Sequence, residues 1–124
     1  MSHSNQSPTD SFLPLKPVVF QILLILAERE RHGYGILQAV RESSAGKIHL
    51  ETGPLYRCLK KLLDGGLIEE LHTPPDPQQD DPRRRCYYRL TGLGQSVLAA
   101  EASRLEELLR HSRSLGIVHK QGAS

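Results

Sequence analysis

The chain has 124 residues, which suits one small domain with an appended helix, and its 38% hydrophobic and 24% charged residues are ordinary for a globular protein. A net charge of +2 and a pI of about 8.7 do not by themselves indicate a nucleic-acid binder, so the distribution of the charge has to be considered. Two cysteines are too few for a disulfide framework and fit a reducing compartment. The longest apolar run is too short to span a bilayer, and no export signal precedes it. We therefore expect a cytoplasmic protein without a membrane segment.

The sequence of the first part of the chain predicts a polar tail followed by two helices. Residues 1–14 include many serines and other polar residues and are predicted to form a disordered N-terminal tail. A helix is expected over about 17–31, because proline suits a first helical turn. Its apolar residues are so dense that more than one surface must cover it. A second helix is expected to begin after the break at Gly33 and to end near Ser44.

The third predicted helix spans Thr52–Asp64, with Thr52 as its N-cap and Gly65-Gly66 as a strong stop signal. One side of this helix carries an apolar stripe of Leu55, Leu59, Leu62 and Leu63. The other side carries cations, and such a helix can lie in the major groove of DNA. We therefore expect DNA contacts from Thr52, Tyr56, Arg57, Lys60 and Lys61, with the Tyr56 hydroxyl meeting a phosphate. The alternative is that the cations form an ordinary solvated face.

Two strands are predicted next, over Leu67–His72 and Cys86–Thr91, joined by a long loop with four prolines. A second basic cluster precedes the second strand: Arg83, Arg84 and Arg85, with Arg89 inside the strand. Arginines at a hairpin tip can follow the phosphate backbone or enter the minor groove, so these three are also expected to bind DNA. The loop also contains acids that could pair with the arginines, and the alternative is a loop that only improves solubility.

The last predicted helix begins after Thr91, a second N-cap, and continues to about Arg113. Leucines and an alanine form a stripe along it: Leu98, Ala102, Leu105 and Leu109. Because the helix extends past a small domain, we expect a second subunit to cover this stripe, together with Phe20 and Leu24 of the first helix. The alternative is that the helix folds back as a fourth core helix.

The order of three helices, a hairpin and a final helix is that of a winged helix-turn-helix. The predicted fold class is therefore mainly α with a small β-hairpin. We expect the winged helix over residues 15–91, a C-terminal dimerisation helix over 92–115 and a flexible tail over 116–124.

Three stretches of the chain resemble the PadR family of bacterial transcriptional regulators: HGYGI (32–36), TGPLYRCLKKLLDGGLIEE (52–70) and RRCYYRLTGLG (84–94). The resemblance implies a homodimeric repressor that binds a palindromic operator through the helix Thr52–Asp64. Many members read GTLY where this chain has Gly53-Pro54-Leu55-Tyr56, so the proline replaces a hydroxyl that could meet a phosphate. The short C-terminal region is similar to the subgroup with one dimerising helix.

The sequence indicates no catalytic site and no cofactor. No two of the six histidines have a metal-ligand spacing with each other or with the cysteines. Cys58 could be a redox-sensing thiol, but a small helix residue near the core edge is the simpler interpretation. Some members of the PadR family bind aromatic effectors at the dimer interface, so a small-molecule effector at that place remains an open hypothesis for this chain. The rival hypotheses are a winged-helix protein-interaction module that does not bind DNA and a regulator without an effector.

Overall fold

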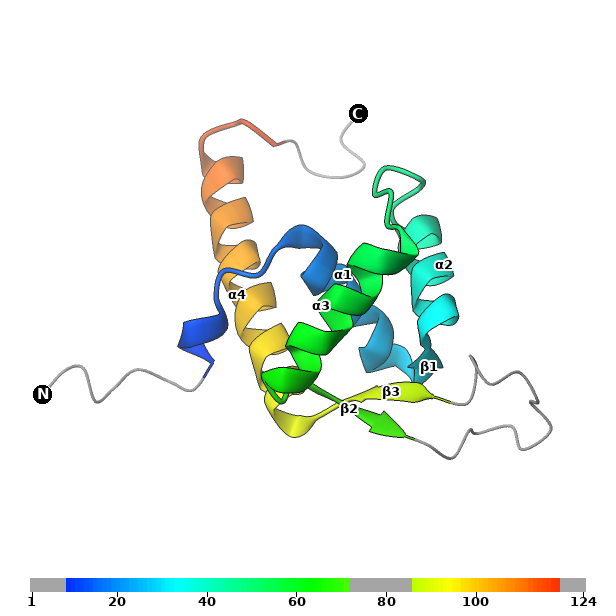
Figure 1. Cartoon of the computed structure of the whole chain (residues 1–124). Coiled ribbons are helices and arrows are strands. Elements are labelled where there is room, and N and C mark those ends of the chain that lie inside the picture. The colour runs from blue at the N-terminus through cyan, green and yellow to red at the C-terminus, as the bar shows by residue number, and fades with distance from the viewer. Residues whose placement is uncertain (1–8, 72–85, 119–124) are drawn as a thin grey trace, which may run out of the picture.

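The computed structural model describes residues 9–71 and 86–118 of the chain. Four α-helices and a small antiparallel sheet make up the fold (Figure 1), as the sequence predicted. The helices are α1 (Pro17–Glu28), α2 (Gly33–Ser43), α3 (Thr52–Asp64) and α4 (Gly92–Ser114). The strands are β1 (Arg31–His32), β2 (Ile68–Leu71) and β3 (Tyr87–Leu90), and a 3-10 helix, η2 (Asp10–Phe12), precedes α1.

The sheet has the strand order β1-β3-β2, and both pairings are antiparallel. β2 and β3 form the predicted hairpin, with Ile68 opposite Leu90 and Leu71 opposite Tyr87. β1 was not predicted, because two residues are too few to show the alternation that marks a strand. It forms because Arg29 adopts extended backbone angles that end α1 at Glu28, three residues before the predicted end.

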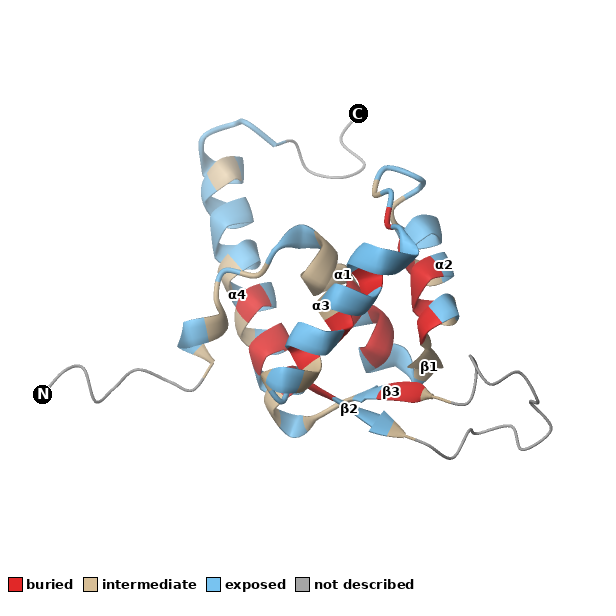
Figure 2. Ribbon diagram, in the orientation of Figure 1, coloured by how far each residue is buried: buried red, intermediate tan, exposed pale blue. Residues whose placement is uncertain are grey.

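Helix α1 is the centre of the core, and it contacts α2, α4 and β3. This arrangement confirms that more than one surface covers its dense apolar residues. Side chains of α1, α2 and α3 form the largest part of the buried cluster, and the first half of α4 adds Val97 and Leu98. Figure 2 shows buried residues along the inner faces of these helices, whereas the second half of α4 is mostly exposed. That half projects past the rest of the domain.

The end of α3 explains why the chain turns so sharply into the hairpin. Gly66 has a φ of 77°, a left-handed value that glycine adopts at little cost. Its N–H donates to the Leu63 carbonyl, and the N–H of Leu67 donates to the Leu62 carbonyl. These two bonds form a Schellman motif. At the other end of α3 the N-cap is Glu51, without a side-chain capping bond, so the prediction of Thr52 as N-cap is wrong. Thr52 is instead the first helical residue.

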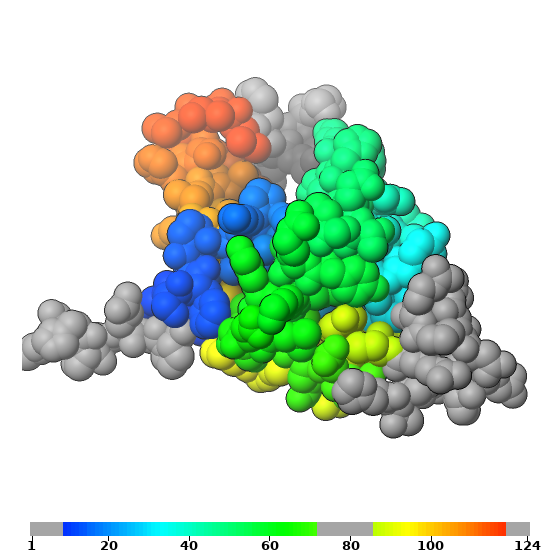
Figure 3. Space-filling view, viewed as in Figure 1, coloured from blue at the N-terminus to red at the C-terminus, as the bar shows by residue number. Residues whose placement is uncertain are grey.

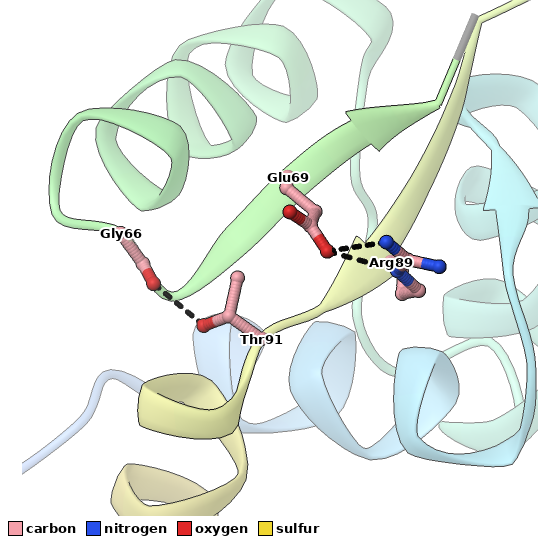
Figure 4. A network of polar contacts seen from close by, with 4 residues as sticks. All are labelled: Gly66, Glu69, Arg89 and Thr91. Carbon is pink, nitrogen blue, oxygen red and sulfur yellow. Dashed lines mark hydrogen bonds and ion pairs between the residues drawn. The ribbon is translucent and has the colours of Figure 1, made fainter.

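Thr91 connects the end of α3 to the start of α4. Its Oγ1 accepts a hydrogen bond from the Gly94 N–H at 3.0 Å, which confirms the predicted N-cap. The same hydroxyl donates to the Gly66 carbonyl at 2.6 Å (Figure 4). A side chain at Gly94 would run into the Leu67 carbonyl oxygen, so the start of α4 lies directly against the chain leaving α3. The hairpin and α4 are thus fixed to one corner of the domain.

The described part of the predicted N-terminal tail is ordered against the core, so the boundary at residue 14 needs correction. Phe12 and Leu13 pack against the hydrophobic cluster, and the Leu15 N–H donates to Glu101 Oε2 at 3.2 Å. Two apolar residues in an otherwise polar stretch provide this anchor. At the other end, residues 116 and 117 close α4 with a second Schellman motif rather than starting a tail. Residues 1–8 and 119–124 of the predicted tails lie outside the described residues.

Candidate nucleic-acid interface

Helix α3 presents the two faces that its sequence predicts. Three leucines are buried, with exposed fractions of 1% for Leu55, 1% for Leu59 and 5% for Leu62. The predicted DNA-contact residues are all exposed: Thr52, Tyr56, Arg57, Lys60 and Lys61. The helix therefore packs on the core through its leucines and directs its cations to solvent. Figure 3 shows α3 crossing the viewed face of the molecule.

The three cations of α3 differ in how they are paired. Lys60 Nζ lies 3.4 Å from Asp64 Oδ2, one turn along the helix, and both side chains are exposed. Within residues 9–71 and 86–118, Arg57 and Lys61 make no ion pair. The Arg57 guanidinium extends over the first turn of the helix, because its Nη1 lies 3.5 Å from where a Cβ on Gly53 would be. Arg57 thus places a charge at the N-terminal end of α3, where a groove-binding helix meets base edges.

Tyr56 brings two of the sequence motifs into contact. A side chain at Gly33, the first residue of α2, would collide with the hydroxyl and ring of Tyr56. The ring therefore lies over the N-terminus of α2, while 42% of the residue remains exposed. The sequence predicted exposure of Tyr56 but gave no sign of this contact. Glycine at position 33 lets the tyrosine ring take this place, and a Cβ there would force the ring to shift.

The start of α2 has a cap that the sequence analysis missed. His32 is the N-cap residue, and its Nδ1 accepts a hydrogen bond from the Gly35 N–H at 3.0 Å. Its ring meets Tyr87 edge-on, with 5.5 Å between ring centroids and 77° between ring planes. Histidine is not among the common N-cap residues, so the capping signal was weak. The order His-Gly before an amphipathic helix was the available hint.

In the hairpin, Arg89 lies opposite Glu69 and pairs with it. The Arg89 Nε and Nη2 lie 2.9 and 2.7 Å from Glu69 Oε2 (Figure 4). The charge of Arg89 is therefore balanced across the two strands. The other predicted wing residues, Arg83, Arg84 and Arg85, lie outside the described residues.

Titratable groups also meet at the loop end of the hairpin strands. The Cys86 thiol donates to Glu70 Oε2 at 3.2 Å. Burial and the neighbouring Glu70 carboxylate raise the pKa of Cys86, which disfavours the reactive thiolate. Burial and the adjacent Cys86 also raise the pKa of Tyr88, so its hydroxyl stays protonated at neutral pH.

The predicted dimerisation stripe on α4 is uncovered only along its second half. Leu98 is 8% exposed and belongs to the core of its own subunit, so the expectation that a partner covers it is wrong. The first half of α4 packs on α1 and β3, which corresponds to the alternative of a fourth core helix. Farther along, Ala102 is exposed, and Leu105 and Leu109 are 36% and 39% exposed.

Helix α1 contributes to the same side of the molecule. Leu24 is 42% exposed, whereas Phe20 is half-buried. A cavity of about 350 Å³ lies between α1 and α4, with Phe20, Leu105 and Glu101 in its wall. We call it the α1–α4 cavity.

Glu101 is a buried carboxylate that the sequence analysis did not identify. It is 1% exposed, and its two oxygens lie 2.7 and 2.9 Å from Nε and Nη2 of Arg104. The Arg104 guanidinium holds the pKa of Glu101 below its usual range, and the Leu15 N–H acts in the same direction against the effect of burial. The Glu-x-x-Arg spacing on a helix was the signal that could have found the pair.

A family model described as the transcriptional regulator PadR-like family matches residues 22–100, which include α2, α3, the hairpin and the first part of α4. The chain belongs to the PadR-like family. Members of this family are transcriptional regulators, so this protein is a regulator of transcription and not an enzyme.

Solved structures of PadR proteins share the fold. A PadR family transcription regulator from Clostridium difficile R20291 is 25% identical, with a TM-score of 0.67, and the match covers 81% of this chain and 98% of that one. Bacillus subtilis PadR, solved in complex with operator DNA, is 26% identical with a TM-score of 0.57. That match covers 70% of this chain and 47% of the longer PadR chain. An uncharacterized Lysinibacillus sphaericus protein is 28% identical over 78 residues, which are 63% of this chain and 68% of the relative.

The described residues of this PadR-like protein lack two other kinds of feature. No helix among them is both long enough and apolar enough to cross a membrane. Residues 9–71 and 86–118 also contain no group of three histidine, cysteine or acidic side chains that could hold a metal ion.

Proposed function

We propose that the protein is a homodimeric repressor that binds a palindromic operator, with α3 of each subunit in the major groove. The observation that carries this proposal is the exposed face of α3, where Arg57 and Lys61 have no ion-pair partner among the described residues. Unpaired cations on a helix that is fixed to the core through leucines are suited to phosphates and guanine. The operator complex of B. subtilis PadR supports the same use of the fold here.

Each α3 residue has a proposed role. Arg57 reads a base edge, because it lies toward the N-terminal end of the helix, and Lys60 and Lys61 meet phosphates. Thr52 begins the helix and is exposed, so its hydroxyl can donate to a phosphate. Tyr56 packs against Gly33 at the start of α2, and its hydroxyl is proposed to meet a DNA phosphate beside that helix.

The wing is proposed to supply affinity without sequence choice. Arg83, Arg84 and Arg85 would extend the basic surface beyond the hairpin and meet the phosphate backbone. Arg89 is left out of this role because it pairs with Glu69.

A second copy is proposed to cover the exposed half of α4. Ala102, Leu105 and Leu109 would pack against the partner, with Phe20 and Leu24 of α1 at the edge of the contact. Leu108, at 52% exposed, widens the apolar face. A dimer places two α3 helices in symmetric positions, which is the arrangement that a palindrome matches. A small-molecule effector would fit the α1–α4 cavity, which the second copy would close.

The test is to select bound fragments from genomic DNA with the full-length protein and to measure affinity by fluorescence anisotropy at physiological salt. We expect an inverted repeat among the selected fragments and one dimer per site. The control is random DNA of equal length. Equal affinity for selected and random fragments would contradict an operator-binding repressor.

The second candidate is a protein-interaction module, and one observation favours it. Glu70 places an acid on β2, which contacts α3, and its carboxylate has no ion-pair partner among the described residues, so it would oppose DNA phosphates. In that case Arg57 and Lys61 meet an acidic protein partner. The absence of measurable DNA binding at low salt would support this module, because nonspecific affinity is largest there.

A further inference from the structure

A second cavity, of about 280 Å³, lies between the N-terminal segment and α3, and we call it the N-terminal cavity. Phe12, Leu15 and Val19 line one side, and Cys58 and Leu62 of α3 line the other. Figure 3 shows the N-terminal segment lying beside α3 on the viewed face. The wall is fixed at both ends, because Phe12 lies against Gly65 and the Leu15 N–H is bonded to the buried Glu101. The cavity is therefore held in place by contacts with α3 and α4.

The charges at this cavity are of one sign. Lys16, the N-cap of α1, and Lys61 of α3 both line it, and no carboxylate does. Among the described residues neither lysine makes an ion pair. Both lysines are exposed, so an anionic group near them would keep contact with water and avoid the cost of full burial. Apolar walls beside two free cations match an anion that carries an apolar body.

The remaining lining residues and the cavity volume limit the size and polarity of the ligand's apolar part. No hydroxyl or amide side chain lines the cavity, so its walls favour an apolar ligand body over one with hydroxyl groups. The volume lies near the lower end of the roughly 300–1,000 Å³ that small-molecule sites occupy, so the ligand is small. We propose that the N-terminal cavity binds an aliphatic monocarboxylate, with its head group between Lys16 and Lys61 and its hydrocarbon chain between the N-terminal segment and α3.

Binding at this place would act on the recognition helix, a consequence that rests on the proposed function. Lys61 is one of the cations assigned to DNA phosphates, and a carboxylate beside it neutralises that charge. This neutralisation lowers the affinity for the operator, so the aliphatic acid acts as an inducer.

The direct test uses Cys58 as a reporter in full-length Cys86→Ser protein without DNA. Octanoate should slow modification of the Cys58 thiol by a maleimide, because the thiol lines the occupied cavity. Lys16→Gln and Lys61→Gln should each weaken octanoate binding by about two- to fivefold, the contribution of one exposed ion pair. Lys47→Gln, which removes a lysine that does not line the cavity, should leave octanoate binding unchanged. Octanol, of similar shape without the charge, should protect less.

Other occupants give other results. Equal protection by acetate or inorganic phosphate would show a simple anion site and overturn the proposal. Protection that rises with protein concentration and not with octanoate would assign the cavity to a second copy. Modification of Cys58 at an unchanged rate in octanoate would also overturn it. Operator affinity with and without octanoate is measured separately: a protein that binds octanoate but no DNA would contradict the proposed function alone, and one whose operator affinity ignores octanoate would contradict induction alone.

Discussion

Arg57 and Lys60 show how neighbouring cations on one helix can differ in what they offer a ligand. Lys60 has Asp64 one turn away, at 3.4 Å, and binding a phosphate would compete with that weak contact. Arg57 has no such partner among the described residues, and its guanidinium lies over the first helical turn. A guanidinium can also make two parallel bonds to guanine, which an ammonium cannot. Arg57 is therefore the residue from which base discrimination is expected.

Replacement of Arg57 should affect specific binding more than nonspecific binding. Arg57→Ala is expected to reduce affinity for the best site by about 1–3 kcal/mol more than affinity for random DNA, the range for a bidentate base contact. Lys60→Ala is the matched comparison on the same helix, and it should weaken both kinds of DNA to similar extents. Anisotropy titrations with both DNAs decide the matter. An equal loss for Arg57→Ala would make Arg57 a phosphate contact, and no loss would leave the basic face as solvated surface.

Glu101 predicts a dependence of stability on pH. Arg104 and the Leu15 N–H lower its pKa in the folded state. Because the folded-state value lies below the unfolded value of about 4.3, Glu101 stabilises the fold above that pH. The stabilisation is lost as the pH falls through the folded-state pKa. Glu101→Gln should cost about 1–3 kcal/mol at neutral pH, since it weakens a buried hydrogen-bonded pair, and should reduce the loss of stability in acid.

The same helix offers a matched control for Glu101. Glu107 pairs with Arg110 at 2.6 Å with the same spacing, but both side chains are mostly exposed. Glu107→Gln should therefore change the free energy of unfolding by less than about 0.5 kcal/mol. Urea unfolding of both variants between acidic and neutral pH makes the comparison. Equal losses for the two variants would show that burial of Glu101 has no energetic consequence.

At the scale of elements, the junction from α3 into the hairpin depends on Gly66. Its left-handed backbone is strained for any residue with a Cβ, so Gly66→Ala should destabilise the fold by about 1–2 kcal/mol. Gly92→Ala is the control, because Gly92 lies in a helix with open space around its Cα and alanine favours helices. Urea unfolding should show a loss for the first variant and no loss for the second. Similar midpoints for both would mean that the turn relaxes without strain.

The wing belongs to the same scale, and its arginines should act on all DNA alike. Consecutive residues in an extended segment point to opposite sides, so at most two of Arg83, Arg84 and Arg85 should reach one backbone. Replacing all three by alanine should weaken specific and random binding together. The slope of log affinity against log salt should also fall by about 0.9 for each phosphate that the variant no longer neutralises. A salt series for both proteins measures this slope, and an unchanged value would make these arginines ordinary surface charge.

Most element boundaries could be predicted because their signals are local in sequence. The cap at Thr91 and the stop at Gly65-Gly66 lie next to the helices that they limit, and both predictions are confirmed. β1 could not be predicted, because its two residues become a strand only by pairing with β3. The candidate site shows the same division. Exposure of Arg57 follows from helical periodicity, whereas contact of Tyr56 with Gly33 depends on how α2 and α3 pack.

At the scale of the whole molecule, periodicity did not reveal which surface covers α4. Leu98 and Leu105 lie on the same predicted stripe, yet Leu98 is 8% exposed and Leu105 is 36% exposed. The difference arises because the buried residues of α4 all lie at or before Glu101, where the helix packs on its own subunit. Burial of Glu101 has the same origin, since the N-terminal segment closes over it. The sequence therefore predicted an uncovered apolar stripe on α4, but the stripe begins at Ala102 and not at Leu98, about one turn later than predicted.

The uncovered half of α4 leads to the prediction about assembly. Leu105→Glu would place an unpaired carboxylate where the second copy is expected, and this should dissociate the dimer. Because Leu105 is partly exposed within one subunit, the variant should still fold as a monomer, which circular dichroism would show. Ser103→Glu adds the same charge at an exposed position outside the stripe, and it should leave the dimer intact. Light scattering at micromolar concentration measures the mass of each protein. A monomer for the unmodified chain would remove the symmetric support for a palindromic operator, and a dimer that survives Leu105→Glu would place the interface elsewhere.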